Sequence, residues 1–595
     1  MLRSFVCVLC CTISLTGCQP FMSEPSEFTT TLRIMSTSDV HGQMLNYDYF
    51  AGHDITGQGL IATATLIEQA RREQPLNLLV ENGDLIQGSA LADYVAEDFP
   101  IQQQTHPIIA MLNALEYDVA NLGNHEFNFG LDFLAASYSD AQFPVVASNL
   151  VVSASAPEQL QNQLQRLVWI EREVVDPTSG ARVPLSIAVI GVTPPQIMQW
   201  DQHHLQGRVS ADGMLSTTQF YAKQAREQGA DVVVLAAHTG MPKQTPDPED
   251  KEQTGWLLAG VAGIDALLLG HQHEVFPGTD AYNRLPEVDS EQGRVRGVPA
   301  VQPGAYGSHL GIIDLPLSYQ PDTGWQVLNP LVSVRAVTAD TPVAHELKPL
   351  LNEAHAATLK FMQQPVGSIA QPLSYRTARW EPSSAVQFVQ RAQGWRARQL
   401  LEASGLEPLP LLSAAAPFAA AFSPDEAATK IAAGELQRGA IGDLYRYPNT
   451  LDVVAINGAQ LRDWLEYSAR GFNEVSASAE NCWAALDQDV PHYNFDSILG
   501  VSYVIDIRKP VGKRVVSLTY NDQPVSEQQR FYVATNNYRA NGGGDFPHLD
   551  GDNVVLRGAD MLADVLLSYL RDLPGRHYDK AVNKHWQVIG CGGRI

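Results

Sequence analysis

Side chains able to bind metal ions follow apolar runs at five places in the first half of the sequence. The stretches are TLRIMSTSDVHGQ, LNLLVENGD, YDVANLGNHE, ADVVVLAAHTG and IDALLLGHQH. Their candidate ligands are Asp39, His41, Asp84, Asn124, His125, His238, His271 and His273. Carboxylate, imidazole and amide groups without thiolates suit Mn, Fe, Co or Zn. A lone histidine after a strand is more often a capping or packing residue, but the repetition of the pattern favours one shared metal site.

The elements that must position these side chains are buried strands. The apolar runs are rich in Val, Ile and Leu, and helix-like segments such as 60–72 and 213–229 lie between them. This alternation predicts an α/β domain whose strands are buried on both faces. In such sheets, sites form at the carboxyl ends of strands. Residues two apart on an extended segment point to the same side, which applies to Asp39 with His41 and to His271 with His273.

Length and charge limit the classes of protein to which the chain can belong. A chain of 595 residues with 45% hydrophobic content is too long for one core, so two large domains are expected. The net charge of -25 argues against binding of long nucleic acid, which requires basic surfaces. A single nucleotide held through metals and stacking remains compatible with this charge.

The N-terminus, MLRSFVCVLCCTISLTGCQP, has the pattern of a targeting segment. Its end resembles the bacterial lipoprotein cleavage box, which predicts a signal over residues 1–18 with lipidation at Cys18; ordinary signal cleavage or an uncleaved anchor are the alternatives. We therefore expect an exported protein, periplasmic or held at the cell envelope, whose contact with a membrane is this N-terminal anchor. Cys482 and Cys591 lie far beyond the signal, and a disulfide and two free buried thiols both fit this pair.

The motif order D-x-H, G-D, G-N-H-E, H-T-G and G-H-x-H resembles the binuclear metallophosphoesterases of the calcineurin-like superfamily. The mature chain as a whole resembles their 5′-nucleotidase branch, in particular the bacterial 2′,3′-cyclic-nucleotide 2′-phosphodiesterase/3′-nucleotidases. This resemblance implies an α/β fold with a metallophosphoesterase sandwich over 28–340, in which helices flank β-sheets. The residues themselves predict a linker helix over 341–364, mostly exposed and with an apolar stripe. For residues 365–595 the resemblance implies a C-terminal α+β nucleotide-binding domain.

The resemblance also implies roles for the candidate ligands. It places Asp39, His41 and His273 on one divalent ion and Asn124, His238 and His271 on a second, with Asp84 bridging the two. His125 would face the substrate phosphate. In relatives this histidine is paired with an aspartate three residues later, but here Asn128 stands at that position. An amide can orient the imidazole without balancing a full positive charge on it; alternatively, Asn128 caps the following helix.

Two tyrosines of the second half match the pair that sandwiches a nucleobase in the family. They are Tyr447 and Tyr538, and Asn449 lies where relatives touch the edge of the base. From the sequence alone, both tyrosines also fit ordinary half-buried loop positions. The stretch that carries phosphate-binding arginines in 5′-nucleotidases matches residues 408–422 here, which contain no arginine.

These features predict hydrolysis of ribonucleoside 2′,3′-cyclic phosphates to 3′-nucleotides, and of 3′-nucleotides to nucleoside and phosphate. The partners would be small nucleotides and two divalent ions. The alternatives are a 5′-nucleotidase or nucleotide-sugar hydrolase, and a surface lipoprotein that binds nucleotides without turnover.

Overall fold

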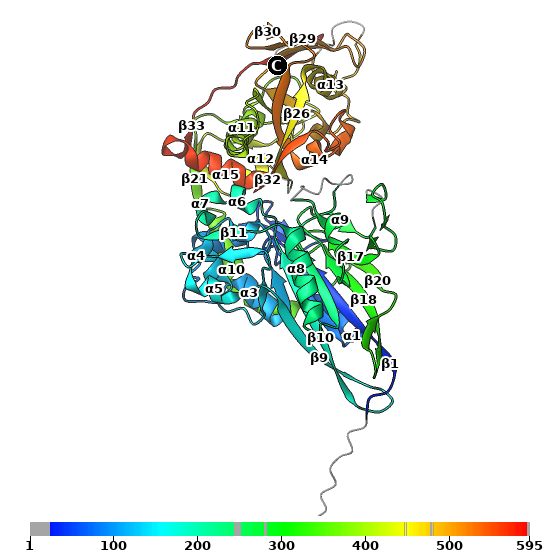
Figure 1. Cartoon of the computed structure of the whole chain (residues 1–595). Coiled ribbons are helices and arrows are strands. Elements are labelled where there is room, and N and C mark those ends of the chain that lie inside the picture. The colour runs from blue at the N-terminus through cyan, green and yellow to red at the C-terminus, as the bar shows by residue number, and fades with distance from the viewer. Residues whose placement is uncertain are drawn as a thin grey trace, which may run out of the picture.

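The chain forms two lobes that lie one above the other (Figure 1). The computed structural model describes residues 24–242, 252–278, 282–445, 447, 449–475, 479 and 481–591. The expected signal with Cys18 lies outside the described residues. In the described part of the chain, no helix combines the length and apolar character that a membrane crossing requires.

Two large β-sheets form the core of the lower lobe, and each has eight strands among the described residues. In spatial order the first sheet contains β19 (Gly324–Val327), β18 (His309–Gln320), β1 (Phe28–Thr37), β4 (Asn77–Asn82), β5 (Val119–Asn121), β6 (Val145–Val146) and β8 (Leu164–Gln165), with β20 (Leu331–Ala336) beside β18. The second contains β15 (Val288–Asp289), β16 (Arg294–Val295), β17 (Val298–Pro303), β13 (Ala266–Leu268), β12 (Val232–Ala237), β10 (Arg182–Val192) and β9 (Val168–Val175), with β14 (Val275–Phe276) beside β17. The central strands of each sheet run parallel.

The two sheets share one hydrophobic interior. Ile34 and Val80 of the first sheet and Val234 and Leu268 of the second belong to the same cluster and are fully buried. Strand β12 is buried at every position because its other face is covered as well. The structure thus confirms the α/β sandwich with strands buried on both faces.

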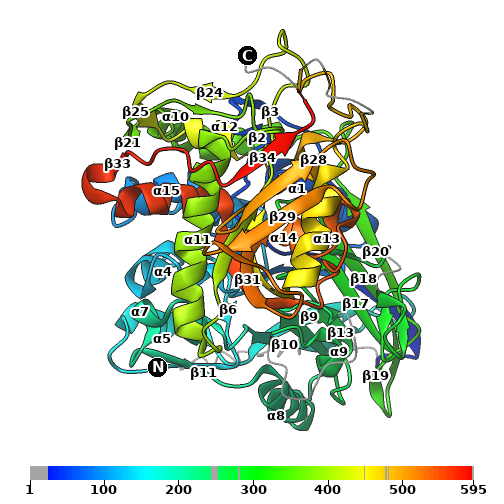
Figure 2. The same cartoon turned by 90° about the horizontal axis from the view of Figure 1, so that it is seen from above.

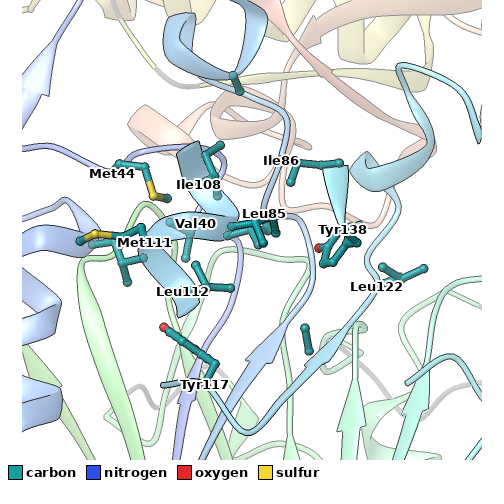
Figure 3. Close-up of a cluster of buried hydrophobic side chains, with 14 of the residues drawn as sticks. Val40, Met44, Leu85, Ile86, Ile108, Met111, Leu112, Tyr117, Leu122 and Tyr138 are labelled. Carbon is teal, nitrogen blue, oxygen red and sulfur yellow. The ribbon is translucent and has the colours of Figure 1, made fainter. Parts of the chain in front are cut away.

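Helices cover the outer faces of the sandwich. The first sheet packs against α1 (Leu60–Glu73), α2 (Ala90–Glu97), α3 (Pro107–Ala114) and α4 (Leu131–Ser137). Figure 3 shows part of this core, where Val40, Leu85 and Leu112 lie close together. The second sheet packs against α8 (Met214–Glu227) and α9 (Gly255–Leu258). Helices α1 and α8 confirm the two helical segments expected from the sequence.

One helix precedes the passage to the upper lobe. A short 3-10 turn at His345–Leu347 leads into α10 (Lys348–Phe361), whose buried residues include Leu351 and Phe361. Helix α10 packs on α2 and α3, so its apolar stripe is buried on the lower lobe. The chain then enters β21 (Pro365–Ile369).

The upper lobe is built around a five-stranded sheet within the described residues. Its strands in spatial order are β27 (Ser497–Leu499), β23 (Leu411–Ala415), β31 (Arg530–Asn536), β26 (Thr450–Asn457) and β32 (Val554–Met561). Helix α11 (Ser384–Ser404) packs on β23 and against α15 (Leu562–Asp572), and Figure 2 shows it running beside this sheet. A second sheet contains β30 (Gln523–Pro524), β29 (Val515–Tyr520), β28 (Ser502–Asp506) and β34 (Trp586–Ile589). This mixed arrangement fits the expected α+β lobe.

Cys482 and Cys591 form a disulfide, with their Cα atoms 5.0 Å apart. The bond joins the segment before β27 to the chain just after β34 across a separation of 109 residues. The sequence left free thiols as an alternative, and the structure shows the bonded pair.

Candidate metal centre and interdomain cleft

Both sheets of the lower lobe end in polar loops on the same side. Strands β1, β4 and β5 lead to Asp39, Asp84 and Asn124, and strands β12 and β13 lead to His238 and His271. Because these strands are parallel within each sheet, their carboxyl ends meet at one edge of the sandwich. The polar cluster therefore lies on the seam between the two sheets.

Several of these loop residues have a left-handed backbone. The angle φ is 54° at Asp39, 51° at His41, 57° at Asp84, 71° at His271 and 60° at His273. Such conformations cost about 1–3 kcal/mol per residue outside glycine and persist only where the surroundings enforce them. Here the His41 amide donates to the Asp84 carbonyl at 2.8 Å, and the His271 amide donates to the Asp39 carboxylate at 2.9 Å. Strain concentrated in this way is typical of functional sites.

Asp39, His41 and His273 form one group of converging ligand atoms. The Nε2 atoms of His41 and His273 are 2.9 Å apart, and Nε2 of His273 is 3.6 Å from Oδ1 of Asp39. Two nitrogens that each bind one ion at ~2.1 Å lie about 3 Å apart when they are at right angles. The observed spacing therefore fits a shared cation.

A second group contains Asp84, His238 and His271. Nε2 of His238 lies 3.0 Å from Oδ2 of Asp84. Ligand atoms of Asp84 and His41 also lie within 4.8 Å of each other. Asp84 therefore stands between the two groups. Both side-chain polar atoms of Asn124 are buried without a hydrogen-bond partner. An unsatisfied buried polar group costs about 1–3 kcal/mol, which a bound metal ion would offset.

The outer nitrogens of two histidines are fixed by backbone carbonyls. Nδ1 of His41 lies 2.9 Å from the Gln87 carbonyl, and Nδ1 of His238 lies 2.7 Å from the Asn82 carbonyl. Because a carbonyl can only accept, Nδ1 is the donor in each ring. In the neutral rings the Nε2 lone pairs are thus directed into the cluster, as metal-ligating histidines require.

The charges of the cluster favour a cation. Burial lowers the pKa of His41 to about 4 and holds that of His273 well below its usual range, so both rings are neutral. Burial also acts to lower the pKa of His238, but the Asp84 carboxylate outweighs it and raises this pKa to about 10. In the metal-free protein a proton on His238 thus balances negative charge. A divalent cation would take over that role and displace the proton.

His125 and Asn128 contact each other, as the family resemblance implied. Nδ1 of His125 lies 2.6 Å from Oδ1 of Asn128. Helix α4 has Gly130 as its N-cap, so Asn128 does not cap it. The Asn128 amide nitrogen lies 3.1 and 3.2 Å from the two carboxylate oxygens of Asp201. Sequence reasoning missed Asp201, because it lies in the connection between α6 (Ile197–Trp200) and α7 (Gln202–Leu205), away from any strand end.

Glu126, the third residue of the N-H-E motif, hydrogen-bonds to the two loops that follow β4 and β5. Its carboxylate accepts hydrogen bonds from the backbone amides of Asp84 at 2.9 Å, Leu85 at 2.6 Å and Gly123 at 2.6 Å. It therefore joins the loop after β4 to the loop after β5. The three consecutive polar residues thus have distinct places: Asn124 at the metal cluster, His125 facing the cleft, and Glu126 behind the loops.

A cleft of about 770 Å³ separates the metal cluster from the upper lobe. Tyr538 and Asn449 line it from above, and Tyr538 is 47% exposed. Tyr447 is also exposed, but its ring contacts Phe418 and Tyr493 at centroid distances of 5.2 and 6.4 Å, beside the residues that line the cleft. The structure therefore brings two of the three expected base-contacting residues to the cleft wall and leaves Tyr447 at its margin.

Several charged residues that line the cleft were not found from the sequence, among them Arg557 and Glu252. Arg557 of β32 reaches it from the upper lobe and hydrogen-bonds to Asp452 and Asn541 at 3.3 and 3.2 Å. Glu252 approaches from the lower lobe, with its carboxylate 3.2 Å from Nε2 of His271. Burial raises the pKa of Glu252, but His271 and Arg557 outweigh it and lower this pKa overall. The cleft therefore has a cation in the upper lobe although residues 408–422 contain none.

Comparison with known proteins matches both lobes. Residues 32–275 match the family model of the calcineurin-like phosphoesterases, and residues 362–551 match that of the 5′-nucleotidase C-terminal domain. The chain is 38% identical over 538 residues to the 2′,3′-cyclic-nucleotide 2′-phosphodiesterase/3′-nucleotidase of Salmonella typhimurium, covering 87% of this chain and 82% of that protein. It is 35% identical over 580 residues to the trifunctional nucleotide phosphoesterase YfkN of Bacillus subtilis, covering 94% of this chain but only 39% of that relative.

A solved structure agrees with these matches. The crystal structure of calcineurin-like phosphoesterase YfkN from Bacillus subtilis is 34% identical, covers 56% of this chain and all of that chain, and has a TM-score of 0.52. Fold and site together define a two-lobed metallophosphoesterase with a centre suited to divalent metal ions. The chain belongs to the family of the 2′,3′-cyclic-nucleotide 2′-phosphodiesterase/3′-nucleotidases. The family and the phosphoester-hydrolysing class expected from the motifs are thereby confirmed.

Proposed function

We propose that this chain hydrolyses ribonucleoside 2′,3′-cyclic phosphates to 3′-nucleotides, and 3′-nucleotides to nucleoside and phosphate. One observation carries the proposal: a single cleft has the ligand clusters on its lower wall and Tyr538 on its upper wall. A nucleotide can span such a cleft with its phosphate below and its base above. Relatives at 34–38% identity carry the name of this activity.

The metal ligands are assigned to two divalent ions, with Mn, Co, Zn or Fe fitting the donor set. Asp39, His41 and His273 would hold one ion, Asn124, His238 and His271 the other, and Asp84 both. When bound, such ions would polarise the phosphoryl group and lower the pKa of water, so that hydroxide would be available as the nucleophile. Most of these ligands are neutral, so positive charge remains available to the anionic transition state.

The other residues of the cleft hold and orient the nucleotide. His125, oriented by Asn128, faces the phosphate group, and Arg557 adds a positive charge from the upper lobe. Tyr538 offers its ring to the base, with Tyr447 and Asn449 beside it. Stacking contributes about 1–3 kcal/mol per base and depends little on base identity. Water adds to phosphorus while the bond to the 2′-oxygen breaks, and that oxygen takes up a proton.

We also infer that the protein is exported and anchored through a lipid on Cys18. The support is the N-terminal pattern of one arginine, a short apolar run and L-T-G-C. Such a location would place the site where nucleotides from RNA breakdown, whose charge prevents passage through membranes, can be converted to nucleosides.

The test compares initial rates on 2′,3′-cyclic AMP, 3′-AMP and 5′-AMP after loading with Mn or Co. We expect turnover of the first two to exceed that of 5′-AMP by at least ~10-fold, and a chelator to abolish all activity until metal is restored. A clear preference for 5′-AMP would instead identify a 5′-nucleotidase. A metal-loaded protein that binds nucleotides but turns over none would identify a binding protein.

A further inference from the structure

We propose that Asp201 is a positioning residue that fixes the proton arrangement of His125 through the side chain of Asn128. This inference rests on the proposed hydrolytic function, because it assigns His125 a defined face toward the phosphate ester. The geometry behind it is a continuous line of contacts from Asp201 to the wall of the cleft.

Asp201 is itself held in place. It is 4% exposed, and its carbonyl accepts hydrogen bonds from the backbone amides of His204 and Leu205 at 2.9 and 3.0 Å. The ring of His204 also reaches the carbonyl oxygen of Asn128, with Nε2 at 3.1 Å. The α6–α7 segment thus contacts Asn128 both at its side chain, through Asp201, and at its backbone carbonyl, through His204.

The two side-chain oxygens of Asp201 determine which way the Asn128 amide points, because one Asn128 atom faces both of them at 3.1 and 3.2 Å. An ionised carboxylate can only accept hydrogen bonds, so the Asn128 atom that faces both Asp201 oxygens must be the NH2 group. The amide oxygen of Asn128 is then directed toward His125. The assignment follows from the donor and acceptor inventory and does not depend on distinguishing oxygen from nitrogen in the side chain.

The orientation of Asn128 in turn determines the tautomer of His125. An amide oxygen accepts, so Nδ1 of His125, 2.6 Å away, must carry a proton. Nε2 is then the ring nitrogen left for the cleft, and the ring lies 5.1 Å from that of His41, between centroids. In its neutral form the ring of His125 therefore presents to the cleft an Nε2 atom that carries no proton.

Asp201 holds the Asn128 amide in a single orientation, which the neutral Asn128 side chain cannot fix by itself. Without a carboxylate behind it, the amide could rotate by half a turn and present its NH2 group to His125. Nδ1 would then act as the acceptor and the proton would move to Nε2. Only a fraction of molecules would have the productive arrangement, so turnover should fall while substrate binding changes little.

The experiment exchanges the two side chains. Asp201→Asn alone should lower kcat by at least ~10-fold on 3′-AMP, with KM within ~3-fold and metal content unchanged. Asn128→Asp alone places two carboxylates side by side without a donor between them and should also be impaired. The double variant Asn128→Asp/Asp201→Asn restores a donor–acceptor chain, with a carboxylate against His125 and an amide behind it. We expect it to recover most of the lost kcat.

Rescue by the exchange distinguishes positioning from a purely structural role, because a structural role predicts that the double variant is no better than the worse single variant. Asp132→Asn, at an exposed position of α4, serves as the matched control. Unchanged kcat in Asp201→Asn, or no recovery in the double variant, would overturn the inference. If the wild-type protein cleaves phenyl phosphate esters but no nucleotide, the proposed substrate is wrong. The kcat values of the single and double variants are then compared on the phenyl ester. If the metal-loaded wild type cleaves neither, both proposals fall.

Discussion

Arg557 and Asp452 are cross-strand partners on β32 and β26, with the guanidinium 3.3 Å from a carboxylate that is almost fully buried. The Arg557 side chain retains 32% exposure at the cleft. The sheet thus holds a cation opposite the metal cluster on a rigid strand rather than on a loop.

Replacing Arg557 by Gln should weaken binding of anionic substrates. A hydrogen bond to a charged group contributes about 1.5–3 kcal/mol, so KM for the dianionic 3′-AMP should rise roughly 10-fold or more. The rise should be smaller for the monoanionic 2′,3′-cyclic AMP. Steady-state kinetics on both substrates measure this difference, with the exposed Arg182→Gln as control. Equal KM values in wild type and variant would show that Arg557 does not contact the substrate charge.

His125→Ala should separate metal binding from turnover. The ring lies in a group with His41 and Asp84, but its Nδ1 is engaged by Asn128 and the other candidate ligands remain, so we expect metal content by elemental analysis to be retained. Turnover should fall by at least ~100-fold, as is common on loss of an electrostatic or acid–base group. Retained turnover would remove His125 from the mechanism, and loss of metal would make it a ligand.

Tyr538→Ala should affect nucleotides selectively. Removal of one stacking surface costs about 1–3 kcal/mol of binding energy, so KM for 3′-AMP should rise. Hydrolysis of bis(p-nitrophenyl) phosphate, which has no base, should change little. The matching substitution Tyr447→Ala tests whether the tyrosine at the margin of the cleft takes part. If Tyr538→Ala slows both substrates equally, its ring has no role in base recognition.

The buried carboxyl group of Asp93 should make stability depend on pH. Burial raises the pKa of Asp93 to about 6, in a cavity between the lobes that Asp564 and Arg438 also line. The folded state then binds this proton more tightly than the unfolded state, so the free energy of unfolding falls as pH rises from about 4 to 6. Above that window the folded protein retains a cost on the order of 1–3 kcal/mol for the buried charge.

Asp93→Asn removes that cost without changing shape. Its Tm should exceed that of the wild type at pH 7.5, by roughly 2–4 °C for each kcal/mol gained, and should match it at pH 4.5. The exposed Asp340→Asn is the control. A Tm difference that is the same at both pH values would exclude a titrating origin.

Much of the lower lobe was predictable because its signals are local. An apolar run followed by a ligand-type residue identifies both a buried strand and its carboxyl end, and the structure places Asp39, Asp84, Asn124, His238 and His271 at such ends. The helices α1 and α8 were recognisable for the same reason. The contact between His125 and Asn128 was expected only because the corresponding residues are paired in the family.

The residues that were missed act through tertiary contacts. Asp201 supports Asn128 from a connection 73 residues away, and Arg557 reaches the cleft from the opposite lobe. Neither stands in a local pattern that distinguishes it from any other charged residue. The pairing of Cys482 with Cys591 was undecided for a related reason, since sequence separation does not reveal Cα distance.

The position of the metal centre on the seam between two sheets has a consequence for synthesis of the protein. Its first ligands are translated before residue 125 and the others only after residue 237. A prematurely terminated polypeptide that ends between them lacks His238, His271 and His273, so we expect it not to assemble the metal centre. We therefore expect metal binding to arise only after the strands that precede His238 and His271 have been made.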